Sequence, residues 1–297
     1  MKKITSLLAI LWCASLSSGI TQAQLKVASL HPLITDVARQ VAGQHAQVVQ
    51  LIGPHSDPHH FQPTPKSLLR AKGAQIYLVS GKDLETYINK LRSTLGGSAT
   101  LVEVGKTIPS QKISDRDSMF VCCPRHARGA IDPHWWHRVS NMQKAARVIA
   151  KEYSKVDPTH AAAYKANAAA YSKRLSSLHS WIKREVSRIP KKNRVLSTAH
   201  AAFGYFCKEY GFKALPVMGI TSQQKPTATY QAEAIREIKK NRVKAVFPEQ
   251  RANPKSLRII AEEAGVKLGG TLVADGAASY EKMMRDNVTQ IVAALAR

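Results

Sequence analysis

Asp157–Pro190, with the sequence DPTHAAAYKANAAAYSKRLSSLHSWIKREVSRIP, is the stretch that decides the fold. Asp157 is a good N-cap and Pro158 suits the first helical position, while Pro190 ends the helix because the residue before a proline avoids the helical region. Apolar residues recur every three or four positions and form one continuous stripe: Tyr164, Ala168, Tyr171, Leu175, Leu178, Ile182, Val186 and Ile189. A helix of this length is about 45–50 Å long, more than one small domain needs. It is predicted to join two lobes, with a coiled-coil or bundle helix as the alternative.

The N-terminus has the pattern of a secretory signal peptide. Two lysines precede an apolar run over residues 4–16, and Ala23 ends a small-residue cleavage site. The apolar run is too short to span a bilayer. Cys13 suggests a lipid anchor, but Trp12 is a poor residue directly before a lipidated cysteine. We therefore expect a soluble protein that is exported to the periplasm.

The chain is long enough for two domains and is strongly basic. Its 297 residues carry a formal net charge of +24, which in an exported protein favours peripheral contact with anionic envelope material. No aromatic-and-basic recognition motif accompanies this charge, so nucleic-acid binding is not expected. Cys122, Cys123 and Cys207 are too few for a disulfide framework. Cys207 is expected to be a small buried hydrophobe.

Strand-like and helix-like runs alternate on both sides of the long helix, a pattern typical of parallel α/β sheets. Before it we expect the strands Leu25–Leu30, Val48–Ile52, Ile76–Ser80 and Thr100–Val104 and the helices Pro32–Gly43 and Lys66–Lys72. After it we expect the strands Arg194–Thr198, Val243–Phe247 and Lys267–Val273 and the helices Ala201–Tyr210, Gln231–Asn241, Pro254–Ala264 and Tyr280–Ala296. The predicted fold is α/β, with two (β/α) lobes and an interlobe cleft.

This pattern also predicts the division of the chain. The expected parts are a signal peptide over 1–23, an N-terminal lobe over 24–156, a linking helix over 157–189 and a C-terminal lobe over 190–297. The least regular segment, Lys106–Ile131, is expected to be a surface loop.

Four polar side chains follow predicted strands or loops where ligands of open α/β sheets bind. They are His59, His134, His200 and Asp275, two on each side of the long helix. Three imidazoles and one carboxylate suit a tetrahedral Zn²⁺ site. Each histidine taken alone is more often a solvated or capping residue than a metal ligand. Together they predict a metal site between the lobes.

The motifs around these residues resemble those of solute-binding proteins that serve zinc and manganese ABC importers, a periplasmic zinc-binding, TroA-like family. The matching stretches are Gly53–Thr64 (GPHSDPHHFQPT), Asp132–Trp136 (DPHWW), His200–Phe206 (HAAFGYF) with Tyr210-Gly211, and Ala274-Asp275 with Tyr280, Met283, Met284 and Asn287. The resemblance covers essentially the whole mature chain. It implies two lobes joined by a backbone helix and, by position, His59, His134, His200 and Asp275 as the metal ligands.

Several residues depart from the family pattern. His60 directly follows His59, so the choice between them depends on register with the aromatic residue two positions later. His137 stands where an aliphatic residue is usual and could support a ligand. Glu249 is a fifth candidate in the cleft, interpreted as a carboxylate that hydrogen-bonds a ligand. The loop between the first two ligands offers only His126 beside the cysteine pair, where zinc-specific relatives often have a His- and acid-rich loop.

The expected function is capture of a divalent metal and its delivery to the permease of an ABC importer, by a monomer. Three nitrogen donors favour Zn²⁺ over Mn²⁺, which remains the alternative cargo. A secreted zinc hydrolase is the alternative from another class, with Glu249 as the only available base. Four protein ligands leave no coordination position for a water, so no enzyme activity is expected. A surface-interaction role could coexist with transport.

Overall fold

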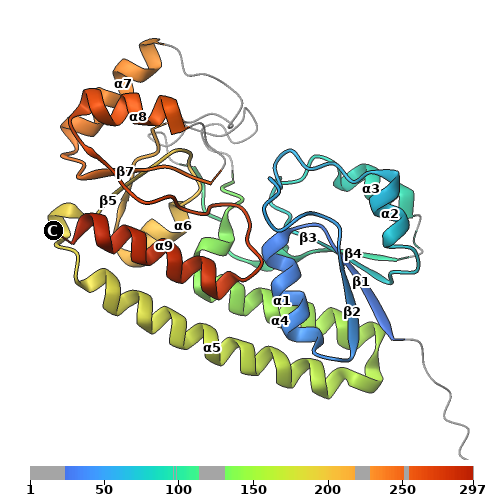
Figure 1. Ribbon diagram of the computed structural model, residues 1–297. Helices are drawn as coiled ribbons and strands as arrows, with labels where there is room; N and C mark the ends of the chain where they lie inside the picture. Colours follow the sequence, from blue (N-terminus) through green and yellow to red (C-terminus); the bar gives the residue numbers. More distant parts are fainter. Residues whose placement is uncertain are drawn as a thin grey trace, which may run out of the picture.

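Two parallel four-stranded sheets form the centres of two lobes (Figure 1). The structure is a computed structural model that describes residues 24–95, 97, 99–113, 131–217, 228–250 and 254–296. The predicted signal peptide, Cys122, Cys123 and His126 lie outside these residues. Among the described helices, none has a stretch long and apolar enough to cross a membrane.

The first sheet has the strand order β2-β1-β3-β4. Its strands are β1 (Leu25–Ser29), β2 (Ala46–Gln50), β3 (Ile76–Val79) and β4 (Thr100–Glu103). Its helices are α1 (Pro32–Ala42), α2 (Pro65–Arg70), α3 (Ile88–Leu95) and α4 (Val139–Val156). The second sheet has the order β6-β5-β7-β8, again all parallel. The predicted class of two parallel α/β lobes is confirmed.

The second lobe has shorter strands than the first. They are β5 (Val195–Thr198), β6 (Lys213–Ala214), β7 (Ala245–Phe247) and β8 (Lys267–Leu268). Its helices are α6 (Gly204–Tyr210), α7 (Ala228–Lys240), α8 (Pro254–Ala264) and α9 (Tyr280–Leu295). The prediction of a strand over Lys267–Val273 is wrong beyond Leu268, where Gly269 and Gly270 follow and glycine disfavours a regular strand. A single parallel bridge between Glu249 and Leu272 continues the contact.

The long helix α5 (Ala161–Ser187) runs beneath both lobes (Figure 1). All eight residues of its predicted apolar stripe are buried. The helix packs on α1 and α4 in the first lobe and on α9 in the second. Asp157 and Pro158 begin a 3₁₀ turn, Pro158–His160, rather than the α-helix itself. One buried apolar cluster, to which α5 contributes, includes residues of both lobes.

Candidate metal centre

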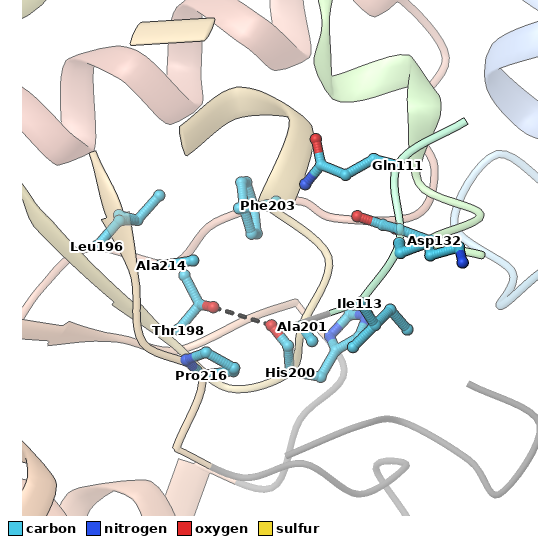
Figure 2. Close-up of a pocket in the computed structure, with 12 residues that line it drawn as sticks. Gln111, Ile113, Asp132, Leu196, Thr198, His200, Ala201, Phe203, Ala214 and Pro216 are labelled. Carbon is cyan, nitrogen blue, oxygen red and sulfur yellow. Dashed lines mark hydrogen bonds between the residues drawn. The ribbon is translucent and has the colours of Figure 1, made fainter. Parts of the chain in front are cut away.

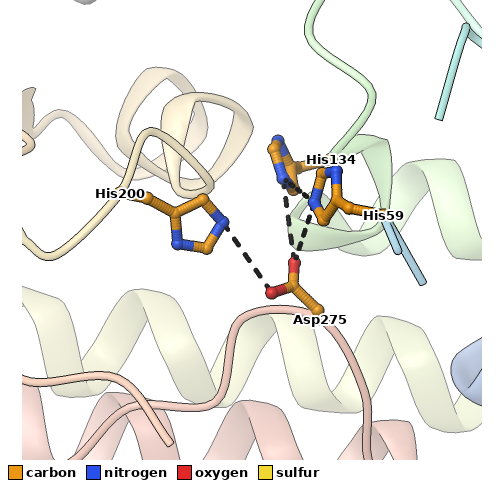
Figure 3. A group of neighbouring side chains, drawn as sticks. All are labelled: His59, His134, His200 and Asp275. Atoms are coloured by element: carbon orange, nitrogen blue, oxygen red, sulfur yellow. Dashed lines mark hydrogen bonds and ion pairs between the residues drawn. The ribbon is translucent and has the colours of Figure 1, made fainter. Parts of the chain in front are cut away.

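His59, His134, His200 and Asp275 converge between the two lobes (Figure 3). His59 lies in the loop between β2 and α2, and His134 directly precedes the 3₁₀ helix η4 (Trp135–His137). His200 follows β5, and Asp275 lies in the loop before α9. One ligand atom from each residue lies within 4.8 Å of the other three. The structure thus brings together all four residues predicted from the sequence.

The distances between these atoms match those expected around one small cation. The Nε2 atoms of His59 and His134 are 3.1 Å apart. Asp275 Oδ1 lies 3.6 Å and 3.7 Å from these two nitrogens, and Asp275 Oδ2 lies 3.8 Å from His200 Nε2. Ligand bonds of about 2.0–2.2 Å place the corners of a tetrahedron about 3.3–3.6 Å apart. These four distances are close to this separation, and the four ligand atoms all lie within 4.8 Å of one another.

Asp275 Oδ1 is buried and has no hydrogen-bond partner among the described residues. Buried oxygens of this kind almost always have a donor, an ordered water or an ion as partner. This oxygen faces two imidazole nitrogens (Figure 3). A cation at the centre of the group would satisfy it.

The two histidines of the first lobe lie in two turns of the same kind. Asp57 Oδ1 accepts a hydrogen bond from the backbone N–H of His59 at 2.8 Å, and Asp132 Oδ1 accepts one from His134 at 2.9 Å. In both Asp-Pro-His sequences the aspartate therefore orients the histidine that follows two residues later. His60 is exposed and is not a member of the four-residue cluster, so the choice of His59 by register agrees with the geometry.

Carboxylates outside the cluster contact the second nitrogen of two of the rings. Asp132 Oδ1 lies 2.8 Å from His134 Nδ1, and Glu249 contacts both His200 Nδ1 and, at 3.0 Å, the His200 backbone N–H. Such partners hold the proton on Nδ1 and leave the Nε2 lone pair for a metal. Glu249 is therefore a supporting carboxylate, as the sequence suggested, and its oxygens are engaged by His200.

These carboxylates also set the charge of the metal-free cluster. Burial lowers the pKa of His200, but Glu249 and Asp275 outweigh it and raise the pKa to about 10. Burial raises the pKa of Asp275, but His200 and His59 outweigh it and hold the pKa well below its usual range. In the absence of a cation, an imidazolium at His200 thus balances the buried carboxylate.

The loop that carries Asp275 lies directly against the first lobe. A Cβ on Gly276 would be 2.8 Å from Pro32 Cγ and 3.0 Å from the Pro54 carbonyl oxygen. The Ala274 carbonyl, on the other side of Asp275, accepts hydrogen bonds from two side chains of the first lobe, described below. Sequence reasoning missed these interlobe contacts, since only the folded chain brings residues 32, 54 and 276 together.

A small cavity adjoins His200 at the interlobe boundary (Figure 2). Its volume of about 20 Å³ has room for one water molecule. Gln111, Ile113 and Asp132 line it from the first lobe, and Thr198 and Phe203 line it from the second. His200 and Asp275 are also the more accessible ligands, with side chains 12% and 13% exposed against 5% for His59 and 2% for His134. The two candidate ligands of the second lobe are therefore more exposed than the two of the first lobe.

Four other described histidines, His31, His45, His160 and His179, contact neighbouring residues away from the cluster. His31 Nδ1 accepts a hydrogen bond from the Leu33 N–H and caps α1, as expected for a structural residue. Burial lowers the pKa of His31 to about 3, so its ring is neutral. His45 stacks on His160 at 4.5 Å, and His179 contacts a tyrosine hydroxyl.

Residues 27–294 match the family described as the zinc-uptake complex component A, periplasmic. The chain belongs to this family. Its membership confirms the resemblance inferred from the four motifs, and the family is defined by a component of an uptake complex rather than by an enzyme.

Known proteins with similar sequences carry names that refer to different metals. The chain is 31% identical to the manganese-binding lipoprotein MntA of Bacillus subtilis, over 97% of this chain and 95% of the relative. It is 30% identical to the zinc-binding protein TroA of Treponema pallidum, over 89% and 87%. The solved structure of the periplasmic TroA of Treponema pallidum superposes with a TM-score of 0.80 at 27% identity, covering 92% of this chain and all of that one.

Proposed function

We propose that this protein captures a divalent metal ion, Zn²⁺ in preference to Mn²⁺, and delivers it to the permease of an ABC importer. The observation that carries the proposal is the convergence of three Nε2 atoms and one carboxylate from two lobes. In this scheme His59, His134, His200 and Asp275 are the metal ligands. Family membership supports the transport role.

The donor set supports the choice of zinc. Zn²⁺ binds well to imidazole nitrogen in tetrahedral sites, whereas Mn²⁺ prefers carboxylate, carbonyl and water oxygens in larger coordination shells. Three of the four donors are nitrogens, and all four ligand atoms lie within 4.8 Å of one another. The names of the relatives include both metals, so the affinity ratio has to be measured on this chain.

A hydrolase is the less favoured function. Such a site needs an open coordination position and a general base beside it. Glu249, the base that this hypothesis requires, is engaged by the ring and the backbone of His200. The four donors already form the number of ligands that closes a tetrahedral zinc site.

We further propose that the protein acts in the periplasm as a monomer and that metal release involves loosening of the lobe that carries His200 and Asp275. His200 and Asp275 are the more exposed ligands, and the small cavity beside His200 gives its ring space. Hydrogen exchange of the metal-free and metal-loaded protein should differ around these two residues. A difference confined to the first lobe would contradict this proposal.

Metal analysis tests the central proposal. Protein purified without chelators or nickel resin should contain Zn²⁺, and in competition should bind Zn²⁺ more tightly than Mn²⁺. His200→Ala should lower zinc affinity by orders of magnitude and retain the fold, because His200 lies outside the apolar core. Equal zinc titrations for the two proteins would remove His200 from the site, and tighter Mn²⁺ binding would reverse the proposed preference.

A further inference from the structure

His137 connects the two lobes at a point next to a ligand on each side. Its Nε2 lies 2.9 Å from the carbonyl oxygen of Ala274, and Trp136 Nε1 donates to the same oxygen at 2.8 Å. Both donors follow His134 within three residues, and Ala274 directly precedes Asp275. Two side chains of the first lobe thus hold the backbone from which the second lobe presents its carboxylate.

His137 occupies a buried space at the cost of an unsatisfied polar atom. The residue is fully buried, its ring packs on Phe203 with 4.4 Å between centroids, and its Nδ1 has no hydrogen-bond partner among the described residues. A buried acceptor without a donor destabilises a fold, whereas an apolar ring of similar size would pack there without that cost. The imidazole donates a hydrogen bond to the Ala274 carbonyl, a contact that a hydrocarbon ring could not make.

We propose that His137 is a positioning residue that holds the Ala274–Asp275 backbone against the first lobe and so places the Asp275 carboxylate among the three imidazoles. The inference depends on the proposed function, since it concerns how tightly the same four side chains bind their cation. Asp275 Oδ1 has no hydrogen-bond partner within the described part of the chain, so the placement of this carboxylate depends on its backbone and on neighbouring charges. The bonds from Trp136 and His137 to Ala274 fix that backbone before any metal arrives.

His137→Phe is the decisive variant because it keeps a ring against Phe203 and removes both the bond to Ala274 and the unpartnered Nδ1. Its zinc affinity, measured by competition with a chromophoric chelator, should fall about 10-fold to 100-fold, the usual effect of losing a group that orients a ligand. The unfolding temperature of the metal-free variant should be unchanged or higher, because the unsatisfied nitrogen is gone. Affinity and stability are thus expected to move in opposite directions.

Further measurements separate positioning from packing. His137→Gln retains a donor and should recover part of the affinity. His179→Phe, which removes the imidazole contact between α5 and the Tyr210 hydroxyl, should leave the affinity unchanged. In metal-free His137→Phe, amides near Asp275 should exchange faster than in the wild type. Bound Co²⁺ should lose visible absorption in the same variant, as a four-coordinate site does when a protein ligand is replaced by waters.

Wild-type affinity in His137→Phe, or a parallel loss of affinity and metal-free stability that His137→Gln does not restore, would overturn the positioning role. A wild-type protein that binds neither Zn²⁺ nor Mn²⁺ would instead reject the proposed function, and the positioning role with it. Hydrogen exchange near Asp275 is measured in metal-free protein. It therefore distinguishes failure of the positioning role from failure of the proposed metal-binding function.

Discussion

Replacing Gly276 by alanine should weaken metal binding without altering a ligand. The added Cβ would lie 2.8 Å from Pro32 Cγ and 3.0 Å from the Pro54 carbonyl oxygen, both in the first lobe. Overpacking of this kind costs about 1–3 kcal/mol. The four ligand atoms meet only while the Asp275 loop lies against that lobe, so the cost should appear in the free energy of binding. Since each 1.4 kcal/mol is tenfold, zinc affinity should fall about 5-fold to 150-fold.

Competition titrations with a chelator measure this change, and Gly265→Ala provides the matched control. Gly265 has a φ of +70° and open space around its Cβ position, so alanine there strains the second lobe without touching the first. The control should lower the unfolding temperature and keep the affinity. Equal affinities of Gly276→Ala and the wild type would refute the reasoning that interlobe contact sets the position of Asp275.

Two further predictions concern the charges around His200. Glu249→Gln keeps an acceptor beside His200 but removes its charge, so zinc affinity should fall about 10-fold to 100-fold in a chelator titration; a change below twofold would deny Glu249 its supporting role. In the metal-free protein the pKa of His200 is raised from 6.5 to about 10, so its contribution to stability is fully present below pH 6.5 and is lost as the pH rises through about 10. Metal must displace that proton, so zinc binding near neutral pH should release about one proton in calorimetry with buffers of different ionisation enthalpy, and binding without release would contradict the raised pKa.

Periodic apolar spacing made the long helix the most predictable element. Its stripe follows the 3.6-residue period, and burial against two lobes follows from its length. Its start was less predictable, because an aspartate before a proline caps a 3₁₀ turn as well as an α-helix, and here Asp157 accepts a hydrogen bond from the His160 N–H at the end of such a turn. The helices α3 and α4 and the short strand β6 were not among the expected elements, although α4 buries residues at the same spacing.

Ligand residues were predictable where local turns determine their direction. The Asp-Pro-His sequences orient His59 and His134 through hydrogen bonds between residues two positions apart, and His200 lies two residues after the end of β5. Asp275 lies after an irregular loop, and its placement depends on Pro32, Pro54 and Ala274, which no local pattern connects. Contacts between lobes arise from tertiary packing, so the sequence predicted the four residues that meet but not the residues that hold them together.

The apolar cluster shared by α5 and both lobes limits how the lobes could be expressed separately or exchanged between proteins. The proposed boundaries at residues 156 and 190 separate the lobes from the long helix only in the order of the chain. In the folded protein, α5 packs on α1 and α4 of the first lobe and on α9 of the second. A half expressed alone would leave one of these surfaces bare to water and prone to precipitate. Recombination that exchanges a single lobe with a relative would also have to exchange the residues of α5 that pack against that lobe.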